Sequence, residues 1–477
     1  MSQHTTTAPS SPHLSAAAAA RRARRRSREL MFQGAGIFCL LLAAALLVWL
    51  MWGIVDKGRF GFTQNMIQLD VYLDPEPLER RDNESEGDLD GEEKYAKRLN
   101  KLNIYFDYIT QAVSEKVPEV AALELSSRNY NKLFSTASAS WIKEGLKDGS
   151  LTPGETITMW VLMDDVVDVY RKGLFSEDAI VAQRVYREDN ITAMKILDEQ
   201  GHLRERLYLG FPRLNFEIWL PFAGKLNWEI TKGSPGFFTS PDSSNPEMVG
   251  IGRAFQGTLL MLLVVVVVAV PLGVAAAIYL EEFAPKNRFT DLIEININNL
   301  AAVPSIIFGV LGLGVLINLL FPFATGWPII GGLVLSFMTL PTVIIASRAA
   351  ILAVPSSYKE AAIGLGASKM QAVFQHVLPA ATPGIASGVI IGIAQAAGET
   401  APLIPIGMKS FIKASCEDGL ACLFEQSTAM PAVIFFWAEH AERLFKFKAN
   451  AAIIVLLAMI LALNAIATLI RIRTERN

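Results

Sequence analysis

Six long apolar runs constrain this chain more than any other feature of its sequence. Each run is close to the roughly 20 residues that an α-helix needs to cross a bilayer. The runs occupy residues 34–52, 257–280, 293–321, 329–352, 383–406 and 451–470. Because 52% of the residues are hydrophobic and only 19% are charged, the composition excludes a disordered chain. The runs exclude a single soluble domain, and we predict an all-α membrane protein with six transmembrane helices.

The distribution of arginine predicts how these helices are oriented. Six arginines lie between Arg21 and Arg28, directly before the first apolar run. Basic residues are retained on the cytoplasmic side, so both the N-terminus and, after six spans, the basic tail are expected inside. The alternative is a cleaved signal peptide. It is disfavoured because the run is long and no small-x-small site follows it.

A polar segment separates the first span from the other five. The stretch EEKYAKRLNKLNIYFDYITQAVSEKV looks helical, whereas ITMWVLMDDVVDVY and LYLGFPRLNFEIWL fit strands equally well. We therefore expect a mixed α/β extracytoplasmic insert between the first two spans. The domain organisation that follows is a disordered basic cytoplasmic N-terminus (1–33), a first transmembrane helix (34–55), the insert (56–250), a membrane domain with five transmembrane helices (251–471) and a cytoplasmic tail (472–477).

The three cysteines are too few for a disulfide scaffold. Cys416 and Cys422 fall in a loop that the predicted topology places outside, where they could form a small disulfide-closed loop. Two free thiols are the alternative. Cys39 lies inside the first span, where we interpret it as a small apolar filler.

The segment between the fourth and fifth spans is unlike an ordinary connection. Residues 353–382 are prone to form helix, polar on one face and broken by Gly364 and Gly366. A glycine permits positive φ and therefore a sharp bend. We expect two short helices joined at a glycine on the cytoplasmic face, the second ended by Pro379, because proline cannot continue the hydrogen-bond ladder.

This segment resembles the EAA signature of the permease subunits of bacterial ABC importers. The matching residues are Glu360, Ala361, Ala362, Gly366, Leu378 and Pro379. His376 departs from the pattern, which usually has a branched aliphatic residue there. The resemblance implies a coupling loop that docks in a groove of an ATPase subunit, with Glu360 facing basic groups and the two alanines permitting close approach. A surface helix without a partner is the alternative.

Two further stretches resemble the phosphate permeases of the PstA type. They are the sequence VPSIIFG at 303–309 and AGETAPL at 397–403. This resemblance covers the membrane domain and the first span, and it does not cover the insert. It implies a multi-pass subunit of a bacterial inner-membrane phosphate importer, partnered by a PstC-type permease, a dimer of PstB-type ATPases and a PstS-type phosphate-binding protein. A permease for another oxyanion or nutrient, or a membrane sensor with an extracytoplasmic ligand domain, remains as an alternative.

Polar residues in the apolar runs are candidates for lining the translocation pathway. An ionisable group at membrane depth costs about 2.5–3.5 kcal/mol, so Glu399 is expected to face a protein interior or a water-filled path. In a continuous helix Gln395 would share its face, and Thr400 follows directly. Ser305 and Arg348 complete the candidates. A structural hydrogen bond is an equal alternative for Glu399, and for Arg348 a positive-inside role is favoured.

Several functional classes find no support in the sequence. The chain has no GxxxxGK[ST] motif, and its five histidines show no metal-ligand spacing. Nucleophile-elbow, CxxC and HExxH motifs are missing as well. We predict no cofactor, no metal, no nucleic-acid partner and no catalytic residue. Energy for transport has to come from a separate subunit.

Overall fold

The computed structural model describes residues 16–75, 102–147, 149–174, 188–208, 213–220, 224–231, 236–243, 245–408 and 419–476. The chain divides into two compact units, Met1–Asp56 and Lys57–Asn477. In the first unit, the described residues belong to α1 (Ala16–Gly58). Its large apolar side chains from Leu30 to Leu50 are exposed, as expected for a helix that faces lipid.

A small antiparallel sheet forms the centre of the polar insert. The strands are β1 (Thr63–Tyr72), β2 (Thr156–Leu162) and β3 (Leu203–Leu207), in the order β2-β1-β3. Ile67 of β1 pairs with both neighbours, and its side chain is fully buried. A second, two-stranded sheet pairs β4 (Arg213–Leu220) with β5 (Gly224–Thr231).

Short helices pack with the central sheet and complete the insert core. Tyr105, Ile109 and Phe134 are among its fully buried side chains. The helices are α4 (Leu102–Lys116), α5 (Pro118–Ala121), α6 (Ser127–Tyr130), α7 (Thr136–Lys147), α8 (Asp165–Arg171) and α10 (Glu188–Glu199). The stretch DVVDVY belongs to α8 and is helical. Asp164 favours this helix by capping its start, where its side chain accepts a hydrogen bond from Val166 N at 3.3 Å.

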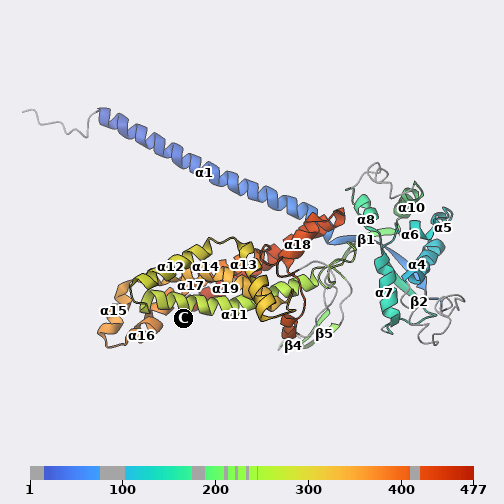
Figure 1. Ribbon diagram of the computed structural model, residues 1–477. Helices are drawn as coiled ribbons and strands as arrows, with labels where there is room; N and C mark the ends of the chain where they lie inside the picture. The colour runs from blue at the N-terminus through green and yellow to red at the C-terminus, as the bar shows by residue number, and fades with distance from the viewer. Residues whose placement is uncertain are drawn as a thin grey trace, which may run out of the picture. The chain divides into compact units, whose positions relative to one another are not determined.

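The described residues of the membrane domain form helices joined by turns and short loops, and none of them lies in a strand (Figure 1). Its elements are α11 (Gly252–Ile278), the π-helical turn η3 (Tyr279–Phe283), α12 (Arg288–Ala301), α13 (Ser305–Leu311), η4 (Gly312–Leu320), α14 (Pro328–Leu352), α15 (Ser356–Gly364), α16 (Lys369–Ala372), η5 (Val373–Val377), α17 (Leu378–Gly398), η6 (Gly419–Phe424), α18 (Met430–Glu439) and α19 (Arg443–Arg476). Among the described residues, five helices are long and apolar enough to cross a membrane, or six with one bent pair. The predicted fold class is confirmed.

The third predicted span, residues 293–321, is that bent pair rather than a single helix. α12 and the helix from Ser305 to Leu320 meet at 102°. The break falls at Ala302–Pro304, and Pro304 adopts φ −55 and ψ 133. Proline lacks the N–H that would continue the ladder, and it disfavours helical backbone in the preceding residue. Pro304 therefore ends one helix and begins another.

The fifth predicted span is also displaced. We expected helix over residues 383–406, whereas α17 ends at Gly398 and residues 401–407 form turns. Pro402, which has no N–H, lies in these turns. At its other end, the helical run begins as early as Lys369.

Small residues let the membrane helices approach closely. A Cβ built on Gly388 of α17 would lie 2.3 Å from Ala346 Cβ of α14, and one on Gly332 of α14 would lie 2.5 Å from Val264 Cβ of α11. In lipid the hydrophobic effect does not hold helices together as it does in water, so close van der Waals packing of this kind stabilises their association.

Candidate functional site

The segment between α14 and α17 folds into two short helices around a glycine. α15 ends at Gly364, Gly366 has φ +94, and α16 begins at Lys369. A left-handed φ of this size suits glycine, because a side chain would strain it. Ser368 and Gln371 form a capping box that starts the second helix. α15 and α16 lie together at one end of the helix bundle (Figure 1).

Pro379 does not end the second helix, contrary to our prediction. It is among the first residues of α17, and the helical run continues from Lys369 to Gly398. The π-helical turn η5 directly precedes α17. The backbone N–H of Leu378 donates a hydrogen bond to Val373 O, five residues earlier. A wider turn of this kind re-registers the hydrogen bonds where proline removes one.

The loop presents both its acidic signature residue and large apolar side chains to solvent. Glu360 and Ala361 are exposed, while Ala362 is buried. Leu365 is 91% exposed, and Met370 and Phe374 are also exposed. Exposed apolar groups clustered with a charge are typical of a surface that another protein covers.

A group of five charged residues ties this loop to three other elements of the bundle. We call Glu281, Glu282, Glu294, Arg348 and Lys359 the loop charge cluster. Arg348 Nε on α14 donates to Glu281 Oε1 of η3 at 2.6 Å, and Arg348 Nη2 lies 2.9 Å from Glu294 Oε1 of α12. Lys359 of α15 pairs with Glu282 Oε2.

Three of the five side chains in the loop charge cluster are largely shielded from solvent, whereas those of Glu294 and Lys359 are 34% and 30% exposed. The side chains of Arg348, Glu281 and Glu282 are 18%, 12% and 10% exposed. Charge pairs shielded from water interact more strongly than surface pairs. A second contact supports the link, because Lys369 Nζ lies 5.3 Å from the centroid of the Phe283 ring. Ion pairs therefore connect α15 to η3, and through Arg348 they connect η3 to α12 and α14.

Sequence reasoning missed four members of this cluster. Arg348 was a pathway candidate, but Glu281, Glu282, Glu294 and Lys359 had no assigned role. The available signal was the Glu281-Glu282 pair directly after an apolar span, since charges that end a span need partners.

The structure separates the candidate pathway residues into two groups. Gly388 and Gly384 of α17 lie opposite Ala346 and Ala350 of α14. Arg348 lies between these two alanines in the sequence, so it is at the same depth in the bundle as residues 384–388 of α17. Gln395 is seven residues beyond Gly388, or about 10 Å along the helix at 1.5 Å per residue. Arg348 therefore does not share a site with Gln395.

The expected shared face of Gln395 and Glu399 does not form. α17 ends at Gly398, and Glu399 is extended with φ −80 and ψ 126. Gln395 is exposed on the helix, whereas Glu399 and Thr400 are half-buried in the segment after it. Helical spacing cannot relate residues on the two sides of a helix end.

The structure does bring together the two stretches that resemble the phosphate permeases. A Cβ built on Gly309 of α13 would lie 2.4 Å from Pro402 O and 2.7 Å from Pro402 Cα. α13, which begins at half-buried Ser305, therefore packs directly on the backbone that follows Glu399 and Thr400.

The cysteine prediction is only partly within the described residues. Cys422 is buried and disulfide-bonded, and Gln256 Nε2 donates to its Sγ at 3.4 Å. Cys416 lies outside the described residues. Cys39 on α1 is an exposed free thiol.

Comparisons with known proteins match two separate parts of the chain. Residues 269–476 match the family "Binding-protein-dependent transport system inner membrane component", and residues 19–180 match a domain of unknown function, DUF3333. A probable ABC transporter permease protein of Bacillus subtilis, YqgI, is 34% identical over 35% of this chain and 56% of its own length. The chain thus spans just over half of that relative.

A longer alignment joins the chain to a relative from Mycobacterium tuberculosis (strain CDC 1551 / Oshkosh). Its phosphate transport system permease protein PstA 1 is 30% identical over 48% of this chain and 72% of that protein. Among solved structures, the inward-facing MetNI methionine ABC transporter has a chain with TM-score 0.38 and 16% identity, covering 46% of this chain and 96% of that one.

Proposed function

Since the chain belongs to the binding-protein-dependent ABC importer permeases of the PstA type, we propose that it is the permease subunit of an ATP-driven phosphate importer. It forms half of the translocation pathway, and a separate subunit hydrolyses ATP. A PstC-type permease, a dimer of PstB-type ATPases and a PstS-type phosphate-binding protein complete the importer.

The observation that carries this proposal is the loop between α14 and α17. It has an exposed carboxylate at Glu360, exposed apolar side chains such as Leu365, and ion pairs that lead into the bundle. In this account an ATPase subunit covers the exposed surface. When the ATPases close on ATP, α15 moves with them, and Lys359 and Arg348 pass the movement to η3, α12 and α14.

The orientation in the membrane follows from the position of the ATPase. A loop that contacts a nucleotide-hydrolysing subunit lies in the cytoplasm, which places the N-terminus and the C-terminal tail there too. The insert then lies outside, where the phosphate-binding protein delivers its cargo.

Phosphate specificity is supported by the PstA relatives and by the contact between Gly309 and Pro402. The candidate pathway residues at this contact, Ser305, Glu399 and Thr400, supply no positive charge. Arg348 is already paired with two carboxylates. We propose that the positive charge along the anion path comes mainly from the partner permease.

Replacement of Glu360 by lysine tests the coupling surface. The change reverses the charge that faces the ATPase, and the exposed site leaves the fold intact. We expect ATP-driven phosphate uptake to fall at least 10-fold, with unchanged amounts of protein in the membrane. Uptake of labelled phosphate by cells or proteoliposomes measures this.

The matched control is Glu199→Lys, which makes the same charge reversal at an exposed position of the insert. Its uptake should equal that of the unmodified protein. Normal uptake by the Glu360 variant would remove the loop from the coupling pathway.

A further inference from the structure

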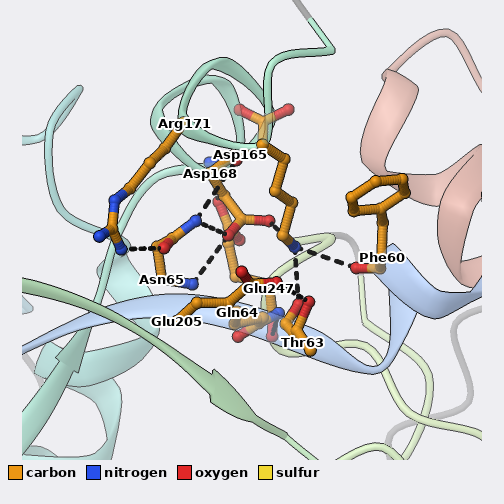
Figure 2. Close-up of polar contacts among 10 residues, drawn as sticks. Phe60, Thr63, Gln64, Asn65, Asp165, Asp168, Arg171, Glu205 and Glu247 are labelled. Atoms are coloured by element: carbon orange, nitrogen blue, oxygen red, sulfur yellow. Dashed lines mark hydrogen bonds and ion pairs between the residues drawn. The ribbon is translucent and has the colours of Figure 1, made fainter.

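Three carboxylates from two separate parts of the chain converge where the insert joins the membrane domain. Asp164 and Asp165 stand at the start of α8, and Glu247 lies in the segment that leads into α11. One carboxylate oxygen from each residue lies within 4.8 Å of the others. Asp165 and Glu247 appear in Figure 2 with the neighbouring hydrogen bonds of Asn65 and Asp168.

Glu247 supplies a second observation that points to a ligand. The residue is 5% exposed, and its Oε1 accepts a hydrogen bond from Asp165 N at 3.0 Å. Its other oxygen, Oε2, is buried and has no hydrogen-bond partner in the described part of the chain. A buried carboxylate oxygen without a donor is costly unless a cation or a proton satisfies it.

Gln64 repeats this pattern beside Glu247. Its Nε2 donates to Glu247 O at 2.6 Å, and the residue is 2% exposed. Its carbonyl oxygen Oε1 is buried and likewise lacks a partner within the described ranges. Unsatisfied acceptors therefore extend beyond the carboxylates, and acceptors are what a cation binds.

Two lysines lie near the cluster, and neither forms an ion pair with Asp165 or Glu247. Lys172 is paired with Asp168, whereas Lys448 Nζ is buried without a hydrogen-bond partner in the described part of the chain. Lys172 Nζ contacts Asp168 Oδ2 at 2.6 Å and donates to Thr63 O and Phe60 O. Lys448 Nζ lies over the rings of Tyr208 and Phe237, at 5.2 and 5.5 Å. Over the described ranges, no Lys, Arg or His nitrogen forms an ion pair with Asp165 or Glu247.

The electrostatics of the cluster agree with this geometry. Burial, followed by repulsion from Asp165, raises the pKa of Glu247 to about 7. Burial likewise raises the pKa of Asp165, with a contribution from Asp168. Carboxylates held together in this way need a shared proton or a bridging cation.

We propose that Asp164, Asp165 and Glu247 bind a divalent cation of the Ca²⁺ type, which joins the insert to the segment entering α11. The ligands are hard oxygens without histidine or cysteine, which disfavours Zn²⁺. Ca²⁺ tolerates irregular oxygen cages, whereas Mg²⁺ demands near-octahedral geometry. Asp164 and Asp165 are only half-buried, so they leave a path by which the ion enters.

The test is Ca²⁺ binding by the purified full-length protein, measured by calorimetry and by Tb³⁺ luminescence with Ca²⁺ competition. We expect the double variant Asp165→Asn/Glu247→Gln to lower the affinity at least 10-fold. Both changes are nearly isosteric. Asp164→Asn, which retains the helix cap, should weaken binding less. Ca²⁺ should also raise the thermal unfolding midpoint of the unmodified protein but not that of the double variant.

A matched double variant, Asp70→Asn/Glu205→Gln, removes two exposed carboxylates from the same insert. It should bind Ca²⁺ like the unmodified protein. If the unmodified protein binds no Ca²⁺, a shared proton satisfies the cluster and the proposal is wrong. It is equally wrong if binding survives in the Asp165/Glu247 double variant, because the ion then binds elsewhere.

Discussion

The substitution Arg348→Glu is expected to abolish phosphate uptake. It removes the two ion pairs to Glu281 and Glu294, and it places a third carboxylate between them. Removing one partner of a buried ion pair costs about 3–5 kcal/mol, and these partly exposed side chains should fall at or below the low end of that range. The repulsion separates η3, α12 and α14, so movement of the loop no longer reaches the bundle. Uptake and ATPase activity of the assembled importer measure the effect.

Three companion variants make this prediction specific. Arg473→Glu reverses an exposed charge on α19 and should retain uptake. Arg348→Lys keeps a cation but loses the two-pronged contact, so uptake should be intermediate. Restoring opposite charges with Glu281→Arg in the Arg348→Glu background should recover part of the activity. Wild-type uptake by Arg348→Glu, at equal amounts in the membrane, would show that the loop charge cluster transmits nothing.

The second large effect is expected from Gly309→Val. Even the Cβ of the new side chain would lie 2.4 Å from Pro402 O, and the obstructing atoms belong to the backbone and cannot rotate away. Overpacking a tight contact costs about 1–3 kcal/mol, and a branched side chain against backbone should reach the upper part of that range. We expect a lower unfolding midpoint in detergent and uptake reduced at least 10-fold, because α13 is forced off the segment after Glu399.

Gly314 of η4 provides the matched control. A Cβ there meets nothing within 4 Å, so Gly314→Val should leave stability and uptake nearly unchanged. Equal stability of the Gly309 and Gly314 variants would mean that the two signature stretches do not depend on this contact.

The sequence was sufficient for the features that depend on local pattern. Apolar runs of sufficient length predict the membrane helices, and the glycines after Glu360 predict the bend that Gly366 makes with φ +94. Both inferences need only the chain's own hydropathy and backbone preferences.

Features that depend on distant contacts could not be predicted in the same way. The 102° bend at Pro304 exceeds what a proline alone specifies, since proline also occurs inside the unbroken helix α14 at Pro341. Arg348 forms ion pairs with Glu281 and Glu294, which lie 67 and 54 positions earlier in the chain. No helical spacing relates residues that far apart.

Pro379 shows the limit of a local rule. Proline ends many helices, but here a π-helical turn precedes it and the helical run continues. The adjustment involves the five residues Val373–Val377 together, so Pro379 alone does not reveal it.

The central claim is that an ATPase subunit covers the loop between α14 and α17. Cross-linking from Leu365→Cys tests it most directly, because this side chain is 91% exposed at the bend of the loop. Cys39, the exposed free thiol, is first replaced by alanine. The account predicts that the Leu365 site captures a subunit that mass spectrometry identifies as a P-loop ATPase, in a nucleotide-dependent yield. Glu199→Cys on the insert should capture none. Failure to capture an ATPase from Leu365, or labelling of that site by a membrane-impermeant reagent from outside, would contradict the account.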